Sequence, residues 1–147
     1  MSEEKNELVI DRTFNAPRDL VWKAWTEPER IRQWLAPRGF TIGMADGELK
    51  PGGRWRQSMT TPDGKELHLG GVYREVKPPE RLVFTHAWDD ENGNPGHETV
   101  VEINFVDRGS KTEMHFRQGG FKSSESRDGH AGGWGECLDK LEEYLVG

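Results

Sequence analysis

Residues 128–147, DGHAGGWGECLDKLEEYLVG, combine an amphipathic helical pattern with an unusual density of glycine. Apolar side chains recur at positions i, i+4, i+7 and i+11, which hold Trp134, Leu138, Leu141 and Leu145. This spacing places them on one face of an α-helix, and Cys137 and Tyr144 widen that face. The stripe predicts a closing helix that packs on a larger apolar surface formed by the rest of the chain.

The first turns of this predicted helix contain Gly132, Gly133 and Gly135. Each glycine in a helix interior is less favourable than alanine by about 1 kcal/mol. Two explanations are open. The missing side chains let the helix backbone approach the sheet closely, or they leave room for a ligand beside Trp134.

From residue 43 to about 119 the sequence alternates with a period of two and is interrupted by turn sequences, namely KPGG, TPDGK, VKPPER, DENGNPG and DRGSK. Asp63-Gly64 is typical of a tight hairpin, whereas Pro78-Pro79 belongs outside a central strand. The pattern predicts an antiparallel meander with one mostly polar face. The other face carries Trp55, Gln57 and Met59; Leu67, Leu69, Gly71 and Tyr73; Leu82, Phe84, His86 and Trp88; Val101, Ile103 and Phe105; Met114, Phe116 and Gln118. This second face requires a cover, and the closing helix supplies it.

Before the meander, residues 7–14 (ELVIDRTF) predict a first strand, and the chain from Pro17 to about residue 35 predicts two short helices. Thr26 and Glu29 have the spacing of a capping box at the start of the second helix. The order is strand, two helices, meander and helix, which predicts an α+β fold with a curved antiparallel sheet on one helix. We expect a single domain over residues 8–147 after a disordered N-terminus at residues 1–7.

Composition restricts the partners of the chain. Its 147 residues carry a formal net charge of −6, and the basic residues are scattered among acids, which is unlike a nucleic-acid-binding surface. No apolar run reaches the ~20 residues of a membrane span, and MSEEKNELVI is no secretory leader. We therefore expect no nucleic acid, no membrane insertion and a cytoplasmic location. The single Cys137 excludes an intramolecular disulfide.

Four segments carry a family resemblance. They are RTFNAPRDLVWKAWTEPERIRQWLAP (12–37), KPGGRWRQSM (50–59), GGVYREVKPPERLVFT (70–85) and GHAGGWGECLDKLEEYL (129–145). In this order they resemble the family named for the activator of the ATPase of the ninety-kilodalton heat-shock chaperone, within the START-like (SRPBCC) superfamily. The resemblance runs from about residue 8 to the C-terminus. It implies the helix-grip fold, with about seven strands around a long C-terminal helix and a cavity that binds hydrophobic small molecules in many relatives.

Gln57 and His86 are polar residues on an otherwise apolar face. In one interpretation each finds a protein hydrogen-bond partner, as buried polar groups normally do. In the other, they orient a ligand, because apolar pockets with a few convergent polar groups are typical small-molecule sites. The predicted ligand-binding residues are Trp55, Gln57, Met59, Tyr73, Phe84, His86, Trp88, Ile103, Phe116, Gln118, Trp134 and Leu138.

The sequence predicts no catalytic residue. Cys137 lies on the apolar stripe, where an inert thiol is expected, and the five histidines lack zinc-site spacing. No metal and no cofactor are expected. The preferred function is binding of a small hydrophobic molecule. The alternatives are stimulation of the ninety-kilodalton heat-shock chaperone's ATPase, as the resemblance implies, and an enzyme or resistance protein that acts on a hydrophobic ligand.

Overall fold

The structure is a computed structural model that describes residues 7–146. The predicted disordered segment falls almost entirely on residues 1–6, which lie outside the described residues. Glu7, the last residue of that segment, is described, and its carboxylate lies 2.7 Å from a guanidinium nitrogen of Arg117.

The element order follows the prediction. The strands are β1 (Leu8–Phe14), β2 (Thr41–Gly47), β3 (Arg54–Thr60), β4 (Glu66–Lys77), β5 (Arg81–Trp88), β6 (Thr99–Arg108) and β7 (Lys111–Gly119). The helices are α2 (Arg18–Thr26), α3 (Pro28–Ile31) and α4 (Ser124–Val146). The α+β class, the two short helices and the long closing helix are therefore confirmed.

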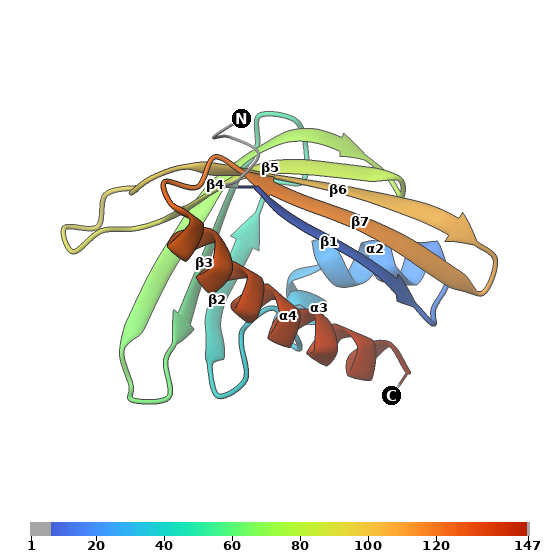
Figure 1. The fold of residues 1–147 in the computed structure, drawn as a ribbon, viewed down its shortest axis with the longest axis horizontal. Helices are drawn as coiled ribbons and strands as arrows, with labels where there is room; N and C mark the ends of the chain where they lie inside the picture. Colours follow the sequence, from blue (N-terminus) through green and yellow to red (C-terminus); the bar gives the residue numbers. More distant parts are fainter. Residues whose placement is uncertain (1–6, 147) are drawn as a thin grey trace.

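The seven strands form one antiparallel sheet in the order β1-β7-β6-β5-β4-β3-β2. Pairing is between chain neighbours from β2 to β7, so the predicted meander is confirmed. The β4–β5 register shifts between Tyr73 and Glu75, and the β2–β3 register shifts between Ile42 and Ala45. Such irregularities bend strands and increase twist, and the sheet curves over the helices (Figure 1).

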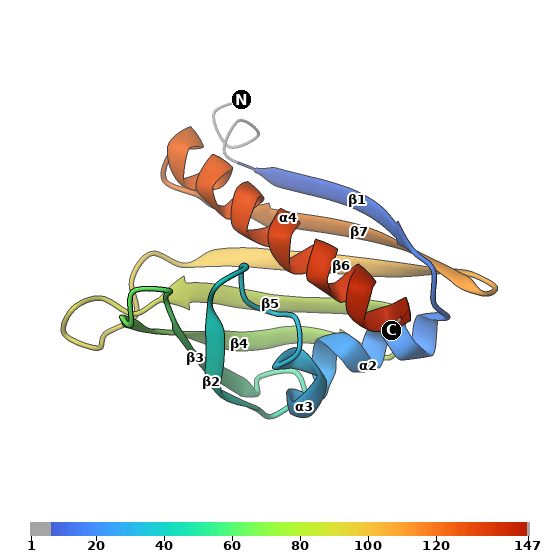
Figure 2. The same ribbon diagram turned by 90° about the horizontal axis from the view of Figure 1, so that it is seen from below.

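α4 lies across the concave face of the sheet, and α2 and α3 lie on the same side (Figures 1 and 2). Leu138 and Leu141 of the predicted stripe are fully buried. Trp25 of α2 stacks on Trp134 of α4, with ring centroids 5.8 Å apart. The apolar face of the meander is thus covered by all three helices, which is the helix-grip architecture.

The start of α3 differs from the predicted capping box. Thr26 ends α2 and donates its hydroxyl to the carbonyl of Trp22 at 2.9 Å, so it makes no cap for α3. Glu27 is the N-cap residue of α3 and provides no side-chain cap hydrogen bond. The prediction fails because α2 continues through Thr26, whose hydroxyl bonds back to the preceding turn instead.

Candidate functional site

A cavity of about 320 Å³ lies between the concave face of the sheet, the segment after α2 and the N-terminal half of α4. Eight of the predicted ligand-binding residues line it: Trp55, Gln57, Met59, Tyr73, Phe84, His86, Trp88 and Trp134. They come from β3, β4, β5 and α4. The strand alternation gathers them because every second side chain of neighbouring strands points to the same face.

The other four predicted residues, Ile103, Phe116, Gln118 and Leu138, are fully buried and lie outside the cavity lining. Ile103, Phe116 and Gln118 share the concave face of the sheet, but helices cover that part of it, and Leu138 belongs to the covering helix α4. Phe116, for example, packs against Trp134 with ring centroids 4.8 Å apart. These side chains therefore belong to the packed core.

The wall also contains residues outside the predicted ligand-binding set. The additional lining residues are Trp25, Ile31, Leu35, Pro37, Phe40, Leu67, Leu69, Leu82, Gly129, His130, Gly133 and Cys137. Those of α4 carried a usable signal, because Gly129, Gly133 and Cys137 recur at i, i+4 and i+8 and share one helix face. Pro37 and Phe40 carried no comparable signal, since they follow the periodic part of the short helices.

The glycines of α4 do not serve close packing. A Cβ atom added at Gly129, Gly132 or Gly135 meets no atom within 4 Å, and one at Gly133 lies 3.8 Å from Cγ of Pro37, an ordinary contact. The close-packing explanation is therefore wrong for these positions. Gly129 and Gly133 instead border the cavity, and exposed Gly129 marks an opening to solvent.

His86 lies among aromatic rings on the cavity wall. Its ring centroid is 5.9 Å from Trp55, 5.8 Å from Trp88, 6.1 Å from His130 and 6.4 Å from Trp134. Burial, and after it the electrostatic effect of the neighbouring His130, lowers the pKa of His86 to about 4. Its Nδ1 atom has no hydrogen-bond partner among the described residues. His86 is thus a neutral polar group whose hydrogen-bonding capacity the protein leaves partly unused.

His130 is held in one tautomer. The indole N–H of Trp88 donates to its Nε2 at 3.1 Å, and its Nδ1 lies 2.8 Å from the carbonyl oxygen of Ser126. Because Nε2 accepts and the carbonyl accepts, the proton resides on Nδ1. This pair connects α4 to the end of β5 beside His86.

Cys137 is the other reactive group on the wall. Burial raises the pKa of its thiol to about 12, so the thiol is protonated at neutral pH. Since the thiolate is the nucleophile, Cys137 is unsuited to covalent catalysis. Among residues 7–146, no group of three or more histidine, cysteine or acidic side chains is placed to hold a metal ion.

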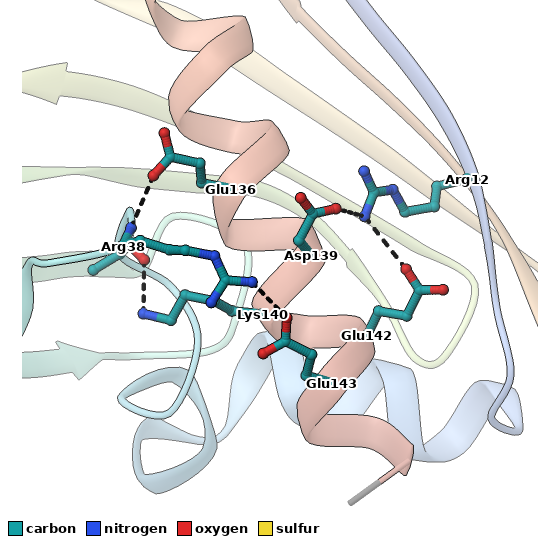
Figure 3. A network of polar contacts seen from close by, with 8 residues as sticks. Arg12, Arg38, Glu136, Asp139, Lys140, Glu142 and Glu143 are labelled. Atoms are coloured by element: carbon teal, nitrogen blue, oxygen red, sulfur yellow. Dashed lines mark hydrogen bonds and ion pairs between the residues drawn. The ribbon is translucent and has the colours of Figure 1, made fainter.

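An ionic network on the outer face of α4 holds the segment that closes one side of the cavity (Figure 3). The backbone N–H of Arg38 donates to Glu136 at 3.0 Å, and its guanidinium lies 2.5 Å from Glu143. Lys140 donates to the carbonyl of Ala36 at 2.9 Å. These contacts fix the segment that contributes Leu35, Pro37 and Phe40 to the wall.

Arg12 extends this network to the opposite side of α4, where its guanidinium lies 2.8 Å from Asp139 and 3.7 Å from Glu142 (Figure 3). Arg12 belongs to β1, so the same helix is tied to the sheet edge and to the cavity wall. Within the described part of the chain, no helix is long and apolar enough to cross a membrane.

Comparison with known proteins places this fold among relatives. The family described as Activator of Hsp90 ATPase homolog 1-like protein matches residues 15–146. A protein of Nitrosomonas europaea has a solved structure with 27% identity and a TM-score of 0.82, over 97% of this chain and 95% of that one. A protein of Rhodobacter sphaeroides is 26% identical, with a TM-score of 0.82 over 97% of this chain and 93% of that one.

A Silicibacter pomeroyi protein described as AHSA1 shares 23% identity and has a TM-score of 0.88, over 95% of this chain and 97% of that one. This likeness concerns the fold. A search of proteins with curated functions gives no match. The family match over nearly the whole described chain agrees with the four segments and with the helix-grip architecture. The chain therefore belongs to the Activator of Hsp90 ATPase homolog 1-like family.

Proposed function

We propose that this protein binds a small hydrophobic molecule in the cavity between β3–β5 and α4. The observation that carries the proposal is the wall itself, in which apolar and aromatic side chains surround a few polar groups such as Gln57, Tyr73 and His86. Small-molecule sites have this composition, and 320 Å³ lies at the lower end of the roughly 300–1,000 Å³ usual for them.

The absence of side chains at Gly129 and Gly133 supports the same proposal. Glycine at these helical positions is unfavourable by about 1 kcal/mol each relative to alanine, and no packing contact requires it. Residues that destabilise a helix without improving its packing are typical of functional positions. Here the missing side chains leave open space at the cavity wall and at its opening.

A titration of isotope-labelled protein with flavonoids, fatty acids, sterols and porphyrins tests the proposal. Two variants provide a matched pair. Gly133→Leu projects a side chain from the cavity wall, whereas Gly132→Leu places the same side chain where an added Cβ meets nothing within 4 Å and which is not part of the wall. We expect saturable amide shifts with at least one class in wild type and Gly132→Leu, and weaker binding in Gly133→Leu.

Equal binding by the two leucine variants would contradict the proposed site, and an absence of binding in every class would contradict the function. The sequence-based alternatives, stimulation of the chaperone ATPase and chemistry on a hydrophobic substrate, stay predictions. No residue of the cavity wall specifically favours either.

A further inference from the structure

The cavity wall carries no formal charge. Among the described residues that line it, none is aspartate, glutamate, lysine or arginine. Its ionisable groups are held neutral: burial raises the pKa of the Tyr73 hydroxyl, and His86 and Cys137 have pKa values of about 4 and about 12. The fourth such group, His130, accepts the indole N–H of Trp88 at Nε2, which only a neutral imidazole can do. A ligand inside the cavity therefore meets no counter-ion.

The cations nearest to the wall segment at residues 35–40 are already engaged. Arg38 pairs with Glu143, and Lys140 donates to the Ala36 carbonyl (Figure 3). The acidic residues of this network are Glu136, Asp139, Glu142 and Glu143, and its basic residues are Arg12, Arg38 and Lys140. Neither Arg38 nor Lys140 lines the cavity, so neither charge is placed to hold the head group of an anionic ligand inside it.

Within the wall, most polar groups near His86 have protein partners. The indoles of Trp55, Trp88 and Trp134 donate to Thr85, His130 and Gln118 respectively. His86, 5% exposed, retains an Nδ1 atom without a partner. The imidazole at the centre of this aromatic cluster therefore has hydrogen-bonding capacity to spare, as does the indole N–H of Trp25 elsewhere on the wall.

We propose that the cavity selects uncharged molecules over anions, and that the imidazole of His86 forms a hydrogen bond with a hydroxyl or other neutral polar group of the ligand. This inference rests on the proposed function and specifies its ligand class. A carboxylate in this cavity would lose its hydration without gaining a cation, which is strongly unfavourable. A neutral hydroxyl loses far less hydration and regains a hydrogen bond.

Three probes with the same ring system test it at neutral pH: naphthalene, 2-naphthol and 2-naphthoate. We expect 2-naphthol to bind about five- to tenfold more tightly than naphthalene, the usual worth of one neutral hydrogen bond. We expect 2-naphthoate to bind at least ~100-fold more weakly than 2-naphthol. Affinities come from titrations followed by amide signals of the labelled protein.

Three variants assign the hydrogen bond. His86→Phe keeps an aromatic ring and removes the polar group, so naphthalene should bind normally while 2-naphthol loses its advantage. His86→Gln keeps a hydrogen-bonding group and should retain part of that advantage. The control His97→Phe makes the same histidine-to-phenylalanine substitution at an exposed position outside the cavity wall, and it should bind all three probes as wild type does.

Equal affinity for 2-naphthoate and 2-naphthol in wild type, or an advantage of 2-naphthol that survives in His86→Phe, would overturn the inference while leaving a ligand-binding cavity in place. Failure of all three probes to bind would instead overturn the proposed function together with the inference. The wild-type comparison decides charge selectivity even when a variant fails to fold.

Discussion

The indole N–H of Trp134 on α4 donates to the side-chain oxygen of Gln118 on β7 at 2.8 Å. The amide of Gln118 donates in turn to Thr99 at 2.9 Å, and the Thr99 hydroxyl donates to the backbone carbonyl of His86 at 3.2 Å. This buried chain joins the helix to β7, β6 and β5 directly beside the cavity. Gln118, expected to contact a ligand, therefore positions Trp134 and satisfies core polar groups.

Replacing Gln118 by leucine should lower the free energy of unfolding by about 2–3 kcal/mol, because it leaves the buried indole N–H of Trp134 without an acceptor. Urea denaturation measures the change. Gln57→Leu is the matched control on the same concave face, at the cavity wall, and should cost less than about 1 kcal/mol. Similar losses in the two variants would contradict the structural role assigned to Gln118.

Gly132→Ala should stabilise the protein by about 1 kcal/mol, since the added Cβ meets nothing within 4 Å and alanine is the better helix former. Gly71→Ala provides the opposite case, because its Cβ would lie 1.9 Å from the carbonyl oxygen of Thr85. That overlap should destabilise the protein by about 1–3 kcal/mol or more. Thermal unfolding compares both with wild type; a loss of stability in Gly132→Ala would show that this part of α4 packs differently.

Stability should depend on pH through His86. Its pKa of about 4 in the folded protein lies below the ordinary value of about 6.5. Between these pH values the imidazole is therefore protonated in the unfolded chain and neutral in the folded protein. The contribution of the neutral His86 ring to the free energy of unfolding is complete above pH ~6.5. It is lost as the pH falls towards ~4, by up to roughly 3 kcal/mol. The titratable ring beside it is His130 of α4.

Urea denaturation of wild type and His86→Phe between these pH values isolates this contribution. The variant should lose distinctly less stability on acidification, because carboxylates titrate in both proteins and cancel in the difference. Parallel pH profiles would mean that His86 is protonated normally in the folded state.

Cys137 should react slowly with thiol reagents. A thiol with a pKa of about 12, against an ordinary value near 9, carries roughly a thousandfold less thiolate at neutral pH. Reaction with a chromogenic disulfide, compared with the urea-unfolded chain as control, measures the difference. Comparable rates would show that the thiol is ionised or exposed in the native protein.

The sequence predicted the fold because its signals are local and agree with one another. Period-two alternation between Arg54 and Gly119 defined the strands, Asp63-Gly64 and Pro78-Pro79 separated them, and the stripe from Trp134 to Leu145 identified the covering helix. The capping box failed because Thr26 has a competing partner in the carbonyl of Trp22. A pattern of spacing does not decide between two local hydrogen bonds.

The site was only partly predictable. Alternation identifies which side chains share the concave face, but not where along the strands the helices make contact. His86 and Gln118 look alike in sequence, both polar on an apolar face. In the structure His86 lines the cavity, whereas Gln118 bonds with Trp134 in the core. Distinguishing them requires the position of α4 on the sheet, which depends on contacts distant in the sequence.

The six tryptophans allow the most direct test of the ligand site. Trp25, Trp55, Trp88 and Trp134 line the cavity, whereas Trp22 and Trp34 are buried outside its lining and serve as internal controls. The measurement is the set of intermolecular nuclear Overhauser effects between bound 2-naphthol and the six indoles. We predict contacts to the four lining indoles and none to Trp22 or Trp34. Contacts confined to other surfaces, or no bound state at all, would contradict a ligand-binding cavity between the sheet and α4.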